Sequence, residues 1–161
     1  MLTVAAFAGL RDAEIKRLDW NEVNLERGFI EVKASKAKSA RRRLIRIQPN
    51  LATGMTPYAS MTGAVVPTNS RTKIDRVWHA AGLQHWPLNG LRHSFASYRL
   101  AATNDAAAVA AELGHTSTKM LYSTYCEVVC PSEAERYWKI APAGEDNVIP
   151  WQNRQLATTG Q

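Results

Sequence analysis

Apolar residues along the chain recur mostly at helical spacing, in segments separated by polar residues, glycine or proline. In one such segment Leu91, Phe95 and Tyr98 follow a near-3.6-residue repeat, which is typical of an amphipathic helix. On this basis helices are predicted over Leu2–Ala8, Ala13–Leu18, Ser70–Ala81, Leu88–Ala102, Asp105–Leu113, Ser117–Tyr125 and Ser132–Ile140. Asp12 is the predicted cap of the second helix, and Gly9, Gly82 and Gly114 each end one.

A different pattern occupies the N-terminal third. Phe29–Lys33 and Leu44–Ile47 are short β-branched runs with partial alternation, and the residues between them, Ala34–Arg43, are polar. Two such runs predict an antiparallel hairpin with a long basic tip. Val65-Val66, before a proline, supplies a brief third strand. The predicted fold class is therefore α+β, mainly α-helical, with a small antiparallel sheet.

The periodic pattern stops near Pro142, which sets the predicted domain boundary. We expect one domain over residues 1–142 and a flexible C-terminal tail over 143–161, in which Val148–Trp151 is a short docking segment. A chain of 161 residues is long enough to bury a single sizeable core.

Charge adds a candidate partner to this picture. The net charge is +6, with a pI near 9.6. Much of the excess falls in one short stretch, which alternates into apolar residues and so belongs to folded structure. Its members are Lys33, Lys36, Lys38, Arg41, Arg42, Arg43 and Arg46. A basic patch held on an ordered surface is typical of a nucleic-acid binder.

Other features exclude some classes of protein. No apolar run reaches the roughly 18 residues of a membrane span. The apolar residues after Met1 lack the preceding basic segment of a signal peptide. Cys126 and Cys130 lack partners at metal-ligand or disulfide-framework spacing and are interpreted as reduced thiols. We expect a cytoplasmic protein, of prokaryotic or phage origin, with neither a membrane partner nor a small-molecule substrate.

Three short motifs carry the chemistry. They are Ala8-Gly9-Leu10-Arg11, Asn89-Gly90-Leu91-Arg92-His93 and Leu113-Gly114-His115, with Tyr125 ten residues after the last. Planar guanidinium groups bind two phosphate oxygens at once and keep their charge, so two arginines suit a phosphodiester in a crowded, anionic transition state. A tyrosine beside them is a candidate nucleophile.

These motifs, in this order, resemble the catalytic domain of the tyrosine recombinases, the phage integrase family. The first corresponds to the family's Gly-Leu-Arg-x-x-Glu pattern, which continues here as Asp12-Ala13-Glu14-Ile15. The resemblance covers nearly all of residues 1–142 but only the catalytic half of a recombinase. It implies a first helix that is cut short and a missing N-terminal clamp domain. The implied activity is DNA cleavage and rejoining through a 3′-phosphotyrosyl intermediate, without metal or nucleotide.

The resemblance also implies a role for each site residue. Arg11, Arg92 and His115 would contact the scissile phosphate, and Tyr125 would attack it; Tyr122 is the rival nucleophile. Lys36 on the hairpin matches the family's general acid best, with Lys33 and Lys38 as alternatives. The remaining basic residues are expected to grip the DNA backbone: Lys33, Lys38, Arg41, Arg42 and Arg43.

Asn89 departs from the family pattern, which commonly has histidine there. Asparagine can donate to a phosphate oxygen but cannot accept the tyrosine proton, which predicts a slower enzyme rather than an inactive one. The resemblance implies double-stranded DNA as the partner and a tetramer on DNA for the full-length protein. The alternatives are a non-catalytic DNA-binding remnant of a truncated integrase and a nicking activity like that of type IB topoisomerases. An RNA-binding module ranks last, because stacking aromatics are missing from the basic stretch.

Overall fold

The computed structural model describes residues 1–37, 41–68, 70–85, 89–125 and 129–142, and in 123–125 the backbone alone. Its α-helices are α1 (Leu2–Ala8), α2 (Asp12–Ile15), α3 (Pro49–Met55), α4 (Ser70–Ala80), α5 (Gly90–Thr103), α6 (Ala106–Leu113), α7 (Thr118–Tyr125) and α8 (Pro131–Trp138). Its strands are β1 (Val23–Asn24), β2 (Phe29–Val32) and β3 (Arg43–Arg46), and two 3-10 helices lie at Trp20–Glu22 and Thr56–Tyr58. The fold class is the predicted one: mainly helical, with a small antiparallel sheet.

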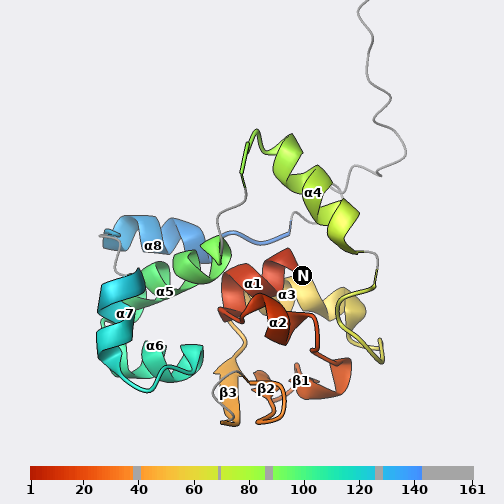
Figure 1. Ribbon diagram of the computed structural model, residues 1–161, viewed down its shortest axis with the longest axis horizontal. Coiled ribbons are helices and arrows are strands. Elements are labelled where there is room, and N and C mark those ends of the chain that lie inside the picture. Colours follow the sequence, from red (N-terminus) through yellow and green to blue (C-terminus); the bar gives the residue numbers. More distant parts are fainter. Residues whose placement is uncertain (38–40, 69, 86–88, 126–128, 143–161) are drawn as a thin grey trace, which may run out of the picture.

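The sheet lies at one end of the molecule, below α1 and α2 in Figure 1. Its strand order is β1-β2-β3, and both pairings are antiparallel. The predicted hairpin is confirmed, since Ile30 pairs with Ile45 and both side chains are fully buried. The predicted third strand is wrong: Val65-Val66 forms no strand, and β1 takes its place. The chain near Val65 contributes only an isolated bridge between Asp19 and Ala64.

Two groups of buried side chains form the core. The larger group joins α1, α2, the sheet and α3, with Leu10, Ile15 and Leu51 among its fully buried members. The smaller group joins α5, α6 and α7 around Phe95 and Leu121. Figure 1 shows these two halves side by side, with α5, α6 and α7 on the left and α1 to α3 on the right.

Helix α8 connects the two halves. The Trp138 ring packs edge-on against Phe95 from one group and contacts Phe7 from the other. The Tyr137 hydroxyl donates to the Ala6 carbonyl at 2.6 Å, and its ring stacks on Tyr98 with centroids 4.1 Å apart. Burial raises the pKa of Tyr137 far above its ordinary value, so this tyrosine serves the core.

Helices α1 and α5 approach each other unusually closely at Gly9. This residue has φ +61°, and a Cβ built on it would lie 2.4 Å from the Phe95 ring. Glycine is therefore needed here both for the left-handed turn and for the contact. The close approach sets Arg11, two residues later, next to the start of α5.

Most predicted helices are confirmed, with shifted ends. The second begins one residue earlier and is shorter than predicted, because Arg11 and not Asp12 is its N-cap. Helix α3 was missed: Pro49 opens it, and its few apolar residues gave no clear period. The predicted tail, including Val148–Trp151, lies outside the described residues, as do Trp86–Leu88 before α5. None of the helices in the described ranges is long and apolar enough to cross a membrane.

Candidate active site

The guanidinium group of Arg92 joins the three motif segments. Arg92 lies in the first turn of α5, and its side chain is buried. Its Nη1 donates to the carbonyl oxygen of Gly9, and its Nη2 donates to the carbonyl oxygen of Leu113 at 2.7 Å. The same Nη2 lies 3.2 Å from Nε2 of His115. Residues more than 80 positions apart in the sequence are thereby held around one cation.

Glu14 holds the other two arginines of the site. Its side chain is buried at the end of the short helix that Arg11 caps. Its carboxylate accepts from the Arg11 backbone at 2.9 Å and from Arg11 Nη1 at 3.1 Å. Arg43 of β3 binds the same carboxylate through both terminal nitrogens, at 3.0 and 2.7 Å. Burial alone would raise the pKa of Glu14, but the hydrogen bonds and charges of these arginines hold it below its ordinary value.

His115 sits among these cations. Its pKa is lowered to about 4, first by burial and then by the charges of Arg92, Arg11 and Arg43. The imidazole is therefore neutral at pH 7. Because guanidinium groups only donate hydrogen bonds, the Nε2 atom that faces Arg92 is the acceptor, and Nδ1 carries the proton. A phosphate placed here would offset the arginine charges and raise this pKa again.

The turn before His115 is shaped by Gly114, the glycine of the third motif. Gly114 has φ +68°, and a Cβ on it would lie 3.2 Å from the side chain of Arg43. Arg43 Nε also donates to the carbonyl oxygen of Glu112 at 3.0 Å. The guanidinium of Arg43 therefore packs against the end of α6 and connects the β-hairpin to the segment that carries His115.

Arg43 was predicted to lie on the exposed basic surface, and this is wrong. The residue is only 9% exposed, and Glu14 and the end of α6 occupy its guanidinium group. Arg41 and Arg42 are exposed, as predicted for residues that grip DNA, although Arg42 also pairs with Glu31 at 2.5 Å. Lys38 lies outside the described residues.

Two of the hairpin lysines, Lys33 and Lys36, pair with a different carboxylate, that of Glu22. Lys36 Nζ is 2.7 Å from Glu22, and Lys33 Nζ is 3.4 Å from the other oxygen of the same carboxylate. The Glu22 side chain is fully buried, whereas those of Lys33 and Lys36 are 48% and 28% exposed. The arrangement brings two of the three candidate general acids to one point but does not choose between them.

Two predicted residues take less defined positions. Asn89 is exposed and caps α5 in the left-handed conformation, with φ 56°, which asparagine tolerates better than most residues. Tyr125 is the last residue of α7, and its side chain lies outside the described residues. The rival Tyr122 is 56% exposed on α7.

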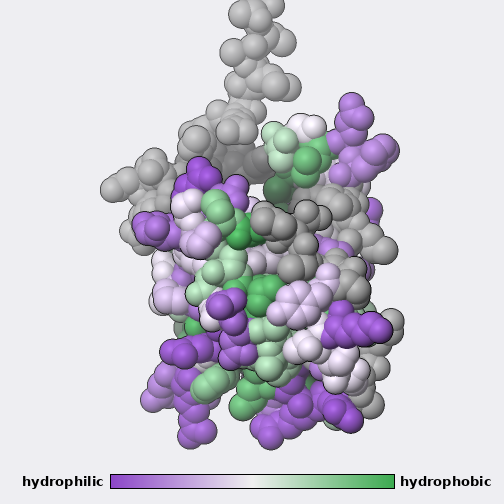
Figure 2. Space-filling view, turned by 90° about the vertical axis from the view of Figure 1, so that its left-hand side faces the viewer, coloured by the Kyte–Doolittle hydropathy of each residue, from purple (hydrophilic) through white to green (hydrophobic). Residues whose placement is uncertain are grey.

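On the face of the molecule that Figure 2 shows, apolar side chains gather in a central strip with hydrophilic ones around it.

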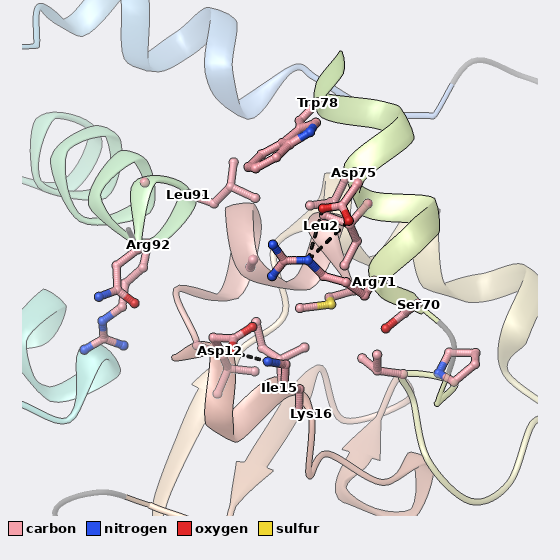
Figure 3. A pocket seen from close by; sticks show the side chains of 18 of the residues that line it. Leu2, Asp12, Ile15, Lys16, Ser70, Arg71, Asp75, Trp78, Leu91 and Arg92 are labelled. Atoms are coloured by element: carbon pink, nitrogen blue, oxygen red, sulfur yellow. Dashed lines mark hydrogen bonds and ion pairs between the residues drawn. The ribbon is translucent and has the colours of Figure 1, made fainter. Parts of the chain in front are cut away.

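A cleft of about 830 Å³ adjoins the site without forming it. It lies between α4, the start of α5, and α1 with α2 (Figure 3). Arg92 and Asn89 line it, but Arg11 and His115 do not. Trp78 and Leu91 face each other across its upper part in Figure 3, and the ion pair of Arg71 with Asp75 lies below them. Among the described residues, no group of three or more His, Cys, Asp or Glu side chains is placed to hold a metal ion.

The sequence patterns assign no role to Glu14 or Glu22, and they do not predict that Arg43 is buried. Glu14 was visible as the residue three after Arg11, a capping-box spacing that places its carboxylate over the helix start. The burial of Arg43 had a weaker signal in the sequence. Arg43 is the last residue of the polar stretch Ala34–Arg43 and directly precedes the alternating run Leu44–Ile47. Glu22 had none, since a lone glutamate in a polar link is usually exposed.

Comparison with known proteins places the chain in a family. The sequence model described as "Phage integrase family" matches residues 1–129. The chain therefore belongs to the phage integrase family, the tyrosine recombinases. No curated protein sequence matches the chain.

Solved structures support the fold. A XerA recombinase aligns with a TM-score of 0.65 and 24% identity, over 84% of this chain and 54% of its own. The XerH site-specific recombinase, in a post-cleavage complex with a palindromic difH substrate, aligns at 0.61 and 20%, over 86% and 44%. The integrase from mycobacterium phage Brujita aligns at 0.60 and 17%, over 90% and 53%. This chain thus spans about half the length of these structures.

Proposed function

We propose that the chain is the catalytic part of an integrase that cleaves and rejoins DNA in site-specific recombination. The observation that carries this proposal is the Arg92 guanidinium, which gathers Gly9, Leu113 and His115 while Glu14 holds Arg11 beside them. Such a cluster of fixed cations and a neutral imidazole suits a phosphodiester whose charge increases in the transition state.

The proposed reaction is a transesterification. The phenolic oxygen of Tyr125 gives up its proton to solvent and forms a bond to the scissile phosphorus, and the bond from phosphorus to the 5′-oxygen breaks. Arg11 and Arg92 offset the charge on the non-bridging oxygens, and Asn89 donates a hydrogen bond to them. His115 donates to them once the bound phosphate has raised its pKa and Nε2 has gained a proton. Lys36 gives a proton to the 5′-oxygen as it leaves, and takes one back when the 5′-hydroxyl attacks the 3′-phosphotyrosine in the reverse step.

Tyr125 is favoured over the other tyrosines on position. A free phenol with pKa about 10 is rarely ionised at neutral pH, so the nucleophile must lie near the cations. Tyr137 is committed to the core through its bond to Ala6. Tyr122 projects into solvent, whereas position 125 falls one helical turn after the fully buried Leu121.

No metal or nucleotide is required in this scheme, because the phosphotyrosyl link retains the energy of the broken bond. The proposed partner is double-stranded DNA in the cytoplasm of a bacterial host. Arg41, Arg42, Lys33 and Lys38 would contact its backbone, without reading sequence. The full-length protein would act as a tetramer on DNA, and Val148–Trp151 would dock on a neighbouring copy.

The second candidate is a non-catalytic DNA-binding remnant. It is favoured by Asn89, which cannot replace a histidine as proton acceptor. A remnant would keep the fold and the basic surface while forming no covalent link to DNA.

A covalent-trapping experiment separates the two candidates. The chain is incubated with a pool of nicked duplexes of randomised sequence, in which the cleaved end diffuses away and the adduct persists. The proposed function predicts an SDS-resistant adduct from the wild type and from Tyr122→Phe, and none from Tyr125→Phe. An adduct that survives Tyr125→Phe and disappears in Tyr122→Phe would mean that Tyr122, and not Tyr125, is the nucleophile. Salt-dependent retention of duplex DNA without any adduct supports the remnant.

A further inference from the structure

Glu22 is a buried carboxylate that the proposed reaction does not yet use. It ends the 3-10 helix before β1, and its side chain has no exposed surface. Oε2 accepts from the backbone of Asp19 at 2.9 Å and from Lys36 Nζ at 2.7 Å. Oε1 lies 3.4 Å from Lys33 Nζ. A buried carboxylate is costly unless it is paired, so these two lysines stabilise it as an anion.

The pairing keeps Glu22 ionised. Burial would raise the pKa of its carboxyl, but the hydrogen bonds from Lys36 and from the Asp19 backbone hold it below its ordinary value. In return, the carboxylate 2.7 Å away limits the rotation of the long, flexible Lys36 side chain. A general acid needs both a proton and a fixed position.

A second contact fixes the backbone that carries Lys36. Nη2 of Arg17 donates to the Lys36 carbonyl oxygen at 2.6 Å, and Nε of Arg17 donates to the Ala13 carbonyl oxygen at 2.9 Å. Ala13 belongs to α2, the helix that Arg11 caps. The first part of the hairpin loop is therefore tied to the same helix as the phosphate-binding cluster, and Glu22 restrains the ammonium group at its end.

Because two lysines face one carboxylate, Glu22 can stay paired when one of the lysines moves away. If Lys36 turned toward a DNA phosphate and Glu22 had no other partner, a buried anion would be left uncompensated, at a cost that opposes the movement. Lys33 already faces the second oxygen, so it can take over the pairing. Its 3.4 Å distance is longer than that of Lys36, as expected for the reserve partner.

We propose that Glu22 is a positioning residue for Lys36, which it holds as a restrained ammonium group on the hairpin, and that Lys33 replaces Lys36 on Glu22 when Lys36 protonates the leaving 5′-oxygen. The inference rests on the proposed function, because it assigns Lys36 the general-acid step. It names a role for a residue outside the motifs.

The test compares two leaving groups. A duplex recovered from the trapping experiment is made with either oxygen or sulfur at the 5′-position of the scissile bond. A thiol has a pKa of about 8.5, so sulfur leaves without a proton. An alkoxide resembles hydroxide, whose parent water has pKa about 15.7, so oxygen leaves poorly without one. Only variants that impair the general acid should lose rate on oxygen and keep it on sulfur.

Glu22→Gln is expected to slow adduct formation on the oxygen substrate by about tenfold or more, and to stay within about twofold of wild type on sulfur. Lys36→Met should show the same selectivity with a larger loss, and Lys33→Met a smaller one. Glu22→Asp, which keeps the charge, should recover part of the oxygen rate. Glu31→Gln is the matched control: it removes an ion pair with Arg42 from the same hairpin, and should leave the oxygen-to-sulfur ratio unchanged.

Each other outcome overturns the inference in a distinct way. Equal losses on both substrates mean that Glu22 acts through the fold alone. An unchanged or faster oxygen rate in Glu22→Gln means that the carboxylate does not help Lys36. Selective loss in Lys33→Met without any in Lys36→Met exchanges the roles of the lysines. If the wild type forms no adduct with either substrate, the proposed function itself fails, and the inference fails with it.

Discussion

Several residues of the candidate site are packed in the interior and also hold the side chains of other site residues in place. Arg92 is buried and donates to two backbone carbonyl oxygens, yet it also lies 3.2 Å from His115. Glu14 pairs with Arg43 in the interior and at the same time orients Arg11, which remains partly exposed. An arginine held by several partners in one orientation loses little entropy when an anion arrives, which is the basis of preorganised electrostatic stabilisation.

The first prediction at this scale concerns the charge of His115. Because burial and three arginines lower its pKa to about 4, the free protein should show an imidazole that is neutral throughout the physiological range. The Cε1 proton of His115, followed by NMR as the pH is varied, is expected to titrate near 4. A midpoint near the ordinary 6.5 would show that the arginines do not surround the ring.

The second concerns the buried pair of Glu14 and Arg43. Glu14→Gln leaves the Arg43 charge without its anion, and breaking a buried pair in this way costs about 3–5 kcal/mol of unfolding free energy. Since the folded-state pKa of Glu14 is lowered, its contribution is present above pH 4.5 and is lost as the pH falls through the folded value. Urea denaturation should therefore show a gap between wild type and variant that narrows below pH 4.5. A gap that is small at pH 7, or constant with pH, contradicts the assignment.

At the scale of elements, the site depends on how closely α1 approaches α5. Gly9 permits that approach, and Tyr137 and Trp138 of α8 brace both helices from the other side. Helix α4 stands apart, because none of its residues is buried. The site therefore lies on the well-packed part of the molecule, and the cleft lies where packing is loosest.

Gly9→Ala tests this contact. The new Cβ would meet the Phe95 ring at 2.4 Å with a left-handed backbone. Left-handed strain of roughly 1–2 kcal/mol and overpacking of roughly 1–3 kcal/mol together predict a loss of about 2–5 kcal/mol. Gly63→Ala is the control, since Gly63 also has positive φ but nothing lies within 4 Å of its added Cβ. Similar losses for the two variants in chemical denaturation would mean that the helix contact is unimportant.

Helices and the hairpin were predictable because their signals are local. The periodicity around Phe95 and the β-branched runs beside the basic stretch depend only on residues that are close together in the sequence. What the sequence concealed was tertiary: the burial of Arg43 is decided by Glu14, 29 positions away, and the pairing of Glu22 by lysines on another element. Three short motifs predicted candidate site residues, but the role of Arg92 in joining the backbones of these motifs follows only from the packing of α1, α5 and α6.

At the scale of the whole molecule, the charge is divided between two places. Arg11, Arg43 and Arg92 gather near His115, whereas Arg41 and Arg42 stand exposed on the hairpin. Under the proposed function, Arg11 and Arg92 of the first group would face one phosphate, and the second group would lie in the general field of a duplex. If the proposed DNA binding is correct, the exposed group should set its dependence on salt.

The salt dependence of DNA binding measures how many phosphates the exposed arginines neutralise. For duplex DNA the slope of log K against log salt is about −0.9 per phosphate neutralised. The Arg41→Gln/Arg42→Gln double variant should reduce the slope by about 2, as measured by fluorescence anisotropy at several salt concentrations. Lys139→Gln on α8, which removes an exposed cation paired with Glu135, should leave it unchanged. An identical slope for the double variant and wild type would place the DNA elsewhere.

The account depends most on the arginines acting upon a single scissile phosphate, and a neutral substrate tests that directly. Replacing one non-bridging oxygen of this phosphate by methyl removes the charge that Arg11 is proposed to offset. Arg11→Ala should slow adduct formation on the normal phosphodiester by roughly 10³-fold or more and on the methylphosphonate far less. If the variant loses the same factor on both substrates, Arg11 does not face the reacting phosphate, and the proposed site is wrong.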